Sequence, residues 1–117
     1  MSGPRLTLDQ WRALVAVVDA GGYARAAEEL RKSQSAITYA VQQVERQLGV
    51  RAFRIEGRRA VLTPPGQMLV QLARLLLEEA GAVEQAARRL AGGWEAEVRL
   101  AVEVAFPTWL LLASLDR

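Results

Sequence analysis

Two short helical patterns joined by a polar turn occupy the stretch from Ala26 to Phe53. Ser33, after the turn, is a favoured N-cap residue, and Gly49 is a favoured residue just past a helix end, so the second helix is expected at about 34–48. Apolar residues recur at helical spacing on both sides of the turn: Ala26, Ala27 and Leu30 before it, and Ile37, Val41, Val44 and Leu48 after it. The pattern predicts a helix-turn-helix.

The outward side of the second helix carries uncharged hydrogen-bonding side chains, whereas a merely solvated helix would more often carry Glu and Lys. Amide and hydroxyl groups can donate to and accept from base edges in the major groove of DNA. The start of this helix is expected to hold a phosphate, because backbone amides and the helix dipole favour an anion there. The residues predicted to contact DNA from the turn and this helix are Lys32, Ser33, Gln34, Ser35, Thr38, Tyr39 and Gln42.

A further helix is expected at the start of the chain. Thr7 and Gln10 have the spacing of a capping box, and Gly21-Gly22 is expected to end the helix. The apolar stripe between them consists of Leu8, Trp11, Leu14, Val15 and Val18. Because Trp11 shares that stripe, it is interpreted as a core residue and not as a DNA contact.

The residues after Gly49 change from helical spacing to alternation. Phe53 and Ile55 precede a turn at Glu56-Gly57, and an apolar run at 60–62 follows it, which predicts a small two-stranded wing. A solvated hairpin is the alternative, but a wing beside a DNA-reading helix would lie within reach of the phosphate backbone. The wing arginines predicted to contact DNA are Arg54, Arg58 and Arg59.

A long helix is expected after the wing. Thr63 followed by Pro64 and Pro65 is typical of a helix start, because proline in the first turn gives up amide donors that have no intrahelical acceptor. About 28 residues would give a rod of roughly 40 Å, which exceeds what a domain this small can cover. A second copy packed antiparallel is expected to cover its apolar stripe, which consists of Leu69, Leu72, Leu76, Ala80, Val83, Ala87 and Leu90.

The tail alternates like a strand from Val98 to Val104, and Pro107 opens a second apolar run. One strand and one helix cannot bury both of their faces, so the chain is interpreted as a fragment of a longer protein. The tail is expected to be poorly ordered or to pack on another chain.

Composition excludes most enzyme classes. The chain has no Cys and no His, so disulfides, thiol catalysis, thiolate zinc sites and imidazole bases are not available. No metal site or cofactor is expected, and carboxylate pairs such as Glu28-Glu29 are most simply solvated helix faces. Residues 1–62 hold 10 Lys and Arg against 6 Asp and Glu, which concentrates positive charge in the half predicted to bind DNA. Without a membrane-length apolar run or a signal-peptide layout, the expected compartment is the cytoplasm.

The same residues resemble the amino-terminal domain of LysR-type transcriptional regulators. The similarity covers roughly residues 6–105, although only the opening of that family's second domain is present. It is carried by Ala26-Ala27, Leu30, Ser33-Gln34, Ile37-Thr38, Val41, Val44-Glu45, Leu48-Gly49-Val50-Arg51 and Phe53, and extends into Gly57-Arg58-Arg59 and Leu62-Thr63. The resemblance implies a bacterial-type regulator that binds DNA as a dimer or higher oligomer, with the long helix as its dimer-forming linker.

Several positions depart from the family pattern where DNA is read. Ser35 replaces the usual Pro, Tyr39 replaces a frequent Arg and Ala40 replaces a Gln, so operator preference cannot be transferred from relatives. In the wing, Ala52 replaces a Leu, and Ile55 takes the place of an Arg that stands instead at 54. A phosphate contact is expected either to have moved by one residue or to be lost.

The resulting expectation is a mainly α protein in three parts. Residues 1–63 form a winged helix-turn-helix DNA-binding domain, 64–92 a dimerisation helix, and 93–117 the start of a truncated effector-binding domain with a β-α remnant. The function expected is sequence-specific binding of double-stranded DNA by a homodimer that regulates transcription. The alternative is a fragment that only pairs with full-length regulators through its long helix. In the LysR-type family tetramers and inducer binding usually need the rest of the second domain, so a small-molecule inducer is expected only for a full-length form.

Overall fold

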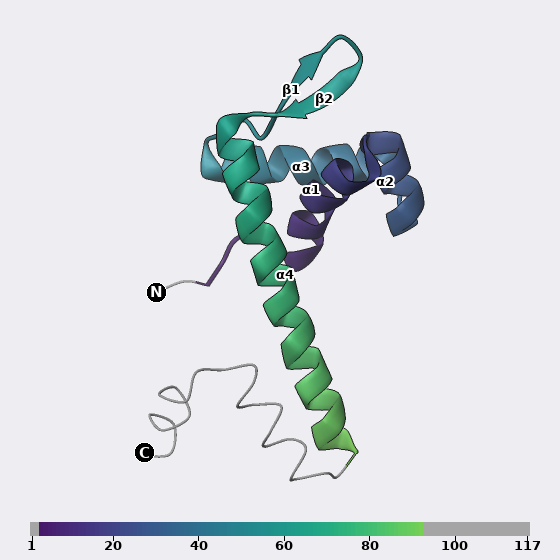
Figure 1. Cartoon of the computed structure of the whole chain (residues 1–117), viewed down its shortest axis with the longest axis vertical. Coiled ribbons are helices and arrows are strands. Elements are labelled where there is room, and N and C mark those ends of the chain that lie inside the picture. Colours follow the sequence, from purple (N-terminus) through teal and green to yellow (C-terminus); the bar gives the residue numbers. More distant parts are fainter. Residues whose placement is uncertain (1–2, 93–117) are drawn as a thin grey trace. The chain divides into compact units, whose positions relative to one another are not determined.

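The computed structural model describes residues 3–92 of the 117-residue chain. These residues form four helices and a two-stranded antiparallel sheet (Figure 1). In chain order the elements are α1 Leu8–Ala20, α2 Tyr23–Leu30, α3 Gln34–Leu48, β1 Phe53–Glu56, β2 Arg59–Leu62 and α4 Pro64–Ala91. The mainly α winged helix-turn-helix followed by a long helix is therefore confirmed. The interpretations of the tail at 93–117 lie outside the described residues.

The local signals at the helix ends correspond to real caps. The Gln10 amide donates to Thr7 Oγ1 at 3.2 Å, while the Thr7 amide donates to Gln10 Oε1 at 2.8 Å, which completes the predicted capping box. Gly21 then ends α1 with φ +86°, a left-handed conformation that glycine adopts without steric cost.

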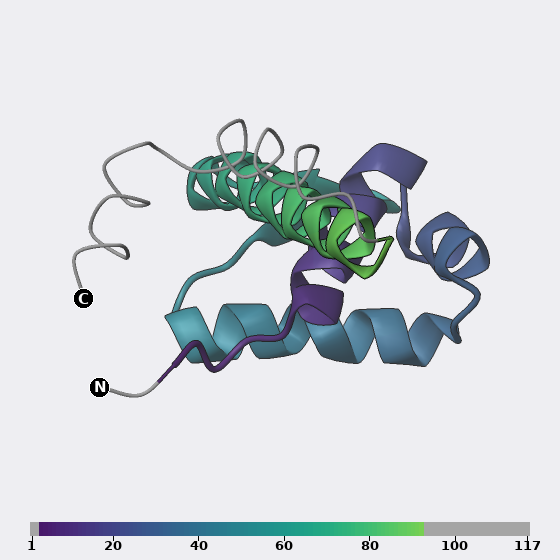
Figure 2. The ribbon, with the colours of Figure 1, turned by 90° about the horizontal axis from the view of Figure 1, so that it is seen from below.

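The core lies where α1, α2 and α3 pack together (Figure 2). Ala26 and Ala27 of α2 are both buried, and their small side chains allow a close approach between helices. Trp11 packs partly buried against the core, as expected, but Leu8 is 40% exposed and does not belong to it. Leu8 is the first residue of α1 and lies at the edge of the packed helices. The largest fully buried side chains are Leu14, Ile37, Val41 and Val44.

The turn between α2 and α3 depends on one unusual backbone conformation. Arg31 caps α2 with φ +55°, in the region where a helix commonly ends on glycine. The Lys32 amide then donates to the Ala27 carbonyl oxygen at 2.9 Å, and Ser33 begins α3 by accepting from the Ala36 amide at 3.1 Å. Local hydrogen bonds thus cap the end of α2 and the start of α3, and a short turn is sufficient to join them.

The wing is a tight hairpin whose register runs from Phe53 opposite Leu62 to Glu56 opposite Arg59. Gly57, in the two-residue loop, has φ +62°, which suits the first position of a type II′ turn. Phe53 is buried and meets Tyr23 edge to face, with ring centroids 6.0 Å apart. Burial raises the pKa of the Tyr23 hydroxyl, and the negative charge of Glu45 adds to this effect. The base of the wing is thus part of the core, and its tip is exposed.

Helix α4 begins as the Thr63-Pro64-Pro65 sequence predicts. Thr63 caps it, because the Gly66 amide donates to Thr63 Oγ1 at 3.0 Å. The first half of α4 belongs to a compact unit that ends at Leu77, so this unit extends beyond the predicted boundary at residue 63. Within the described residues, Glu78 to Gly92 belong to a second unit, and the domain limits stay a prediction. Within residues 3–92, no helix is both long enough and apolar enough to cross a membrane.

Candidate nucleic-acid interface

The start of α3 presents hydrogen-bonding groups to solvent. The Ser33 hydroxyl caps the helix and lies 3.2 Å from the Ser35 hydroxyl. The Ala36 amide donates to this capping hydroxyl. The amides of Gln34 and Ser35 lie in the first turn of the helix, where no intrahelical acceptor exists. Lys32 in the preceding turn makes a loose ion pair with Asp9, with Nζ 3.8 Å from Oδ2. This end of the helix is therefore suited to an anionic oxygen such as a phosphate.

The polar side chains predicted to read bases lie on one side of α3. Positions 34, 38 and 42 follow one another at four-residue steps, and positions 35 and 39 form an adjacent row, so both rows share a face. Tyr39 is 60% exposed although it is the largest side chain of this group. Thr38 is half-buried, whereas the fully exposed members of the group are Gln34, Ser35, Tyr39 and Gln42.

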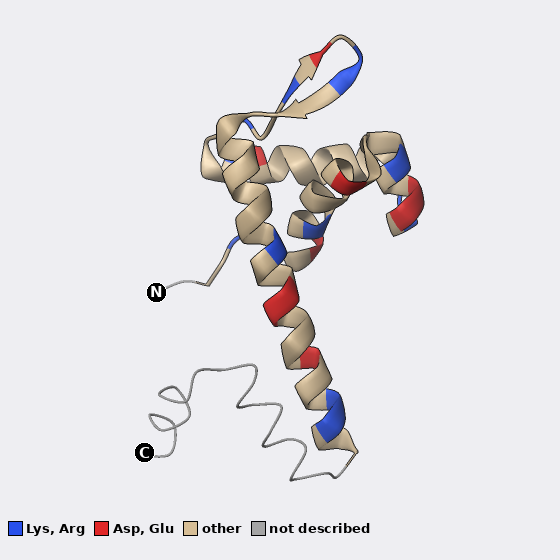
Figure 3. Cartoon of the chain, viewed as in Figure 1, with Lys and Arg blue, Asp and Glu red and all other residues tan. Residues whose placement is uncertain are grey.

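The three wing arginines differ in whether a carboxylate pairs with them. The Arg54 guanidinium donates to Glu56 Oε1 at 3.0 and 3.2 Å, so its charge is already compensated within the strand. Arg58 and Arg59 are exposed at the tip and, among residues 3–92, have no carboxylate within 4.0 Å. Figure 3 shows cationic residues along the hairpin. The tip is thus the part of the wing best suited to phosphates.

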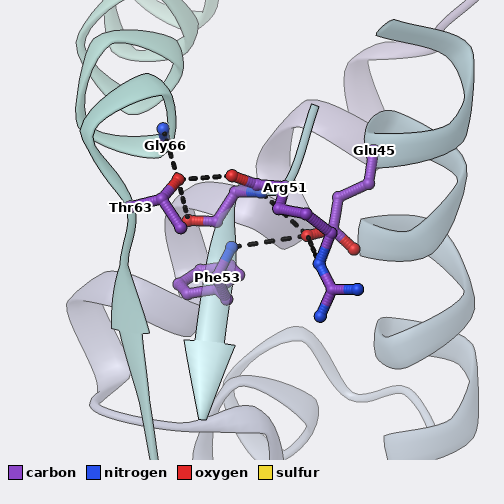
Figure 4. Close-up of polar contacts among 6 residues, drawn as sticks. Glu45, Arg51, Phe53, Thr63 and Gly66 are labelled. Atoms are coloured by element: carbon purple, nitrogen blue, oxygen red, sulfur yellow. Dashed lines mark hydrogen bonds and ion pairs between the residues drawn. The ribbon is translucent and has the colours of Figure 1, made fainter. Parts of the chain in front are cut away.

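Glu45 connects α3 to the base of the wing (Figure 4). Its Oε2 accepts from the Ala52 amide at 2.8 Å and from the Phe53 amide at 3.3 Å, and lies 3.9 Å from Arg51 Nε. Glu45 is one of the residues that carry the family resemblance, but its role in the wing was not predicted from the sequence. The sequence does contain a signal for a buried contact of Glu45. This residue follows Val41 by four positions and adjoins Val44 on the inward side of α3, where an acid needs a polar partner.

Thr63 and Gly66, at the start of α4, contact the backbone at the base of the wing. The Thr63 amide donates to the Ala52 carbonyl oxygen at 3.0 Å, and the Thr63 hydroxyl also contacts the carbonyl oxygens of Arg51 and Ala52. Gly66 is buried so closely against this backbone that an added Cβ would lie 2.1 Å from the Ala52 oxygen. Glu45 and Thr63 together fix the base of the wing between α3 and α4.

Helix α4 carries an exposed apolar face, as predicted, but its composition differs in part from the predicted stripe. Leu69 packs against the core of its own domain, whereas Leu72 and Leu76 are exposed. Met68 and Leu75 are exposed apolar residues that the predicted stripe omitted. In the second unit, Val83 is 48% and Leu90 62% exposed, Ala87 is exposed and Ala80 is half-buried.

The sequence of this chain is similar to that of known proteins. Residues 8–67 match the family model described as bacterial regulatory helix-turn-helix protein, lysR family. The chain is 36% identical over 112 residues to the probable HTH-type transcriptional regulator YhaJ of Escherichia coli K12, covering 96% of this chain but 38% of YhaJ.

Solved structures of DNA-binding domains are similar as well. The crystal structure of a BenM DBD/catB site 1 DNA complex aligns with a TM-score of 0.70 at 28% identity over 74% of this chain and 97% of that one. A CbnR DBD–DNA complex aligns with a TM-score of 0.68 at 35% identity, covering 74% and 99%. These matches support the prediction that the chain is not an enzyme.

Proposed function

Because this chain belongs to the LysR family of bacterial regulatory helix-turn-helix proteins, we propose that it binds specific double-stranded DNA as a homodimer and thereby regulates transcription. The observation that carries the proposal is the exposed, uncharged polar face of α3 together with a wing tip that exposes two arginines. The helix supplies donors and acceptors for base edges, and the tip supplies phosphate contacts. DNA complexes of two structural neighbours support the same use of the domain.

The homodimer is proposed from the exposed apolar face of α4. Met68, Leu72, Leu75, Val83 and Leu90 leave apolar surface in water along a 28-residue helix, which a second copy would cover. The chain spans 38% of the length of YhaJ, so any inducer response is proposed only for a longer form. Its action on bacterial DNA would place the protein in the cytoplasm.

Selection from a pool of random duplexes, combined with the mass of the chain in solution, tests this function. Enrichment of an inverted repeat by a dimer is the expected result, because a two-fold protein binds two half-sites. A dimer that enriches no sequence would favour a fragment that acts only by pairing with full-length regulators. A monomer that enriches nothing would contradict both functions.

Replacing Gln34 or Thr38 with alanine is expected to reduce discrimination between the selected site and random DNA. A well-formed contact to a base edge is worth about 1 to 3 kcal/mol of discrimination, while binding to random DNA stays nearly unchanged. Competition binding against random duplex measures the difference. Gln47→Ala, an exposed glutamine farther along α3, is the matched control. Equal weakening on all sequences would remove both residues from base reading.

Replacing Arg58 and Arg59 together with alanine is expected to flatten the salt dependence of DNA binding. Each lost phosphate contact lowers the slope of log affinity against log salt by about 0.9, so the double variant should lose up to roughly 1.8. Titrations at several salt concentrations measure this slope. The control is the pair Arg88 and Arg89 on α4, whose replacement should leave the slope unchanged. An unaltered slope in the wing variant would show that the tip does not touch phosphates.

A further inference from the structure

An ion pair between α1 and α4 lies where the run of buried residues in the first half of α4 ends. Val70 and Ala73 are 4% and 2% exposed, whereas Leu75 and Leu76 are 58% and 40% exposed. Between these two groups, the Arg74 guanidinium donates to both carboxylate oxygens of Asp19, at 2.6 and 3.0 Å. The two residues are 55 positions apart in the sequence. This pair is therefore a polar contact between α4 and the three-helix body at the edge of the packed region.

The geometry of the pair favours one orientation of the two helices. A bidentate guanidinium–carboxylate contact is planar, so it restricts rotation as well as distance. The Arg74 guanidinium lowers the pKa of the Asp19 carboxyl, mainly through the hydrogen bond, so both groups are charged at neutral pH. Both side chains are about half exposed, and the contact is consequently too weak to decide whether the domain folds. A contact of this strength can still change the relative populations of closely similar helix orientations.

A small rotation of α4 at Arg74 gives a larger displacement at its far end, because α4 is one continuous helix from Pro64 to Ala91. About 17 residues follow Arg74, which corresponds to roughly 26 Å of helix. A rotation of about 10° at Arg74 would displace the far end by roughly 4 to 5 Å. The rise of DNA per base pair is about 3.4 Å. An orientation error of this size therefore equals a change in half-site separation of about one base pair.

We propose that the Asp19–Arg74 pair is a positioning contact that sets which half-site spacing the dimer accepts. The inference rests on the proposed dimeric function, because only two domains joined through α4 have a defined separation. Neither residue needs to touch DNA. The role differs from that of Arg88, which pairs with Glu84 one turn away on the same helix and cannot orient α4 against another element.

The test uses the inverted repeat recovered from the random-duplex selection, rebuilt with its spacer lengthened or shortened by one and two base pairs. For the original chain, each altered spacer should weaken binding. In Arg74→Ala this penalty should fall by about fivefold, while binding to the isolated half-site stays the same. The charge-swapped double variant Asp19→Arg, Arg74→Asp should restore the penalty, and Arg74→Lys should give an intermediate value because it retains charge without the planar fork. Arg88→Ala is the matched control and should behave like the original chain.

The possible results distinguish a failure of the positioning role from a failure of the proposed dimeric function. An unchanged spacer penalty in Arg74→Ala, or a penalty that the charge swap does not restore, would overturn the positioning role and leave the proposed function standing. An original chain that binds all spacers equally would overturn the dimeric function and the positioning role together.

Discussion

Gly66→Ala is expected to destabilise the domain by about 3 kcal/mol or more, the upper end of what overpacking costs. The new Cβ would lie 2.1 Å from the Ala52 oxygen, 2.9 Å from its carbonyl carbon and 3.0 Å from its Cα. These are backbone atoms held by Glu45 and Thr63, so no side chain can rotate to relieve the overlap. Urea unfolding measures the free energy of unfolding. The midpoint temperature should fall by more than about 10 °C, since 1 kcal/mol corresponds to roughly 4 to 8 °C in a domain of this size.

Gly81→Ala is the matched control on the same helix. Among residues 3–92, no atom outside its own stretch of helix lies within 4 Å of a Cβ built at Gly81. Alanine is the better helix former by about 1 kcal/mol, so this variant should be more stable than the original chain. The two substitutions thus have opposite expected signs. Equal stability of Gly66→Ala and the original chain would contradict the close approach of α4 to Ala52. A loss of stability in Gly81→Ala would indicate that another helix packs on that position.

Glu45→Ala is expected to cost about 2 kcal/mol of stability and to weaken DNA binding in addition. The substitution removes the acceptor for the amides of Ala52 and Phe53, residues that are 0% and 5% exposed, and an unsatisfied buried amide costs about 1 to 3 kcal/mol. Water can reach part of the vacated space, because the Glu45 side chain is 18% exposed, which keeps the loss below the sum for two amides. Urea unfolding gives the stability, and salt titrations with random duplex give the binding.

The conservative variant separates hydrogen bonding from charge. Glu45→Gln keeps one acceptor oxygen, so it should lose less stability than Glu45→Ala. Glu28→Ala, an exposed acid on α2, is the control and should change stability by less than about 0.5 kcal/mol. If Glu45→Ala were as stable as this control, the base of the wing would have to be held by Thr63 and the core contacts of Phe53 alone.

The helix and strand boundaries were largely predictable because their signals are local. The capping box at Thr7, the Ser33 cap and the Thr63-Pro64 start each involve residues within three or four positions of one another. A cap satisfies amides that the helix itself leaves without partners, so its chemistry can be read directly from the chain. The polar face of α3 was predictable for a similar reason, since burial of every third or fourth residue assigns the remaining positions to the outside.

Individual residues within these elements were less predictable. Leu8 has the spacing of a core residue, yet it is the first residue of α1 and is 40% exposed. Leu69 has the spacing of the exposed stripe, yet it packs on its own domain. Arg54, whose contact with DNA stays a prediction, pairs with Glu56 on its own strand, and that pair was not predicted from the sequence. Periodicity gives the direction of a side chain, whereas its surroundings depend on which other elements reach it.

The sequence by itself determined the order of the elements, the polar helix proposed to read DNA and the family, because these depend on hydrophobic period, capping residues and a shared motif. Only the tertiary structure decided how the wing and α4 are held on the three-helix body. The contacts responsible join Glu45 to Ala52 and Phe53, Gly66 to Ala52, and Asp19 to Arg74. Their partners come from different elements, up to 55 residues apart, and no local pattern specifies which side chains meet once those elements pack.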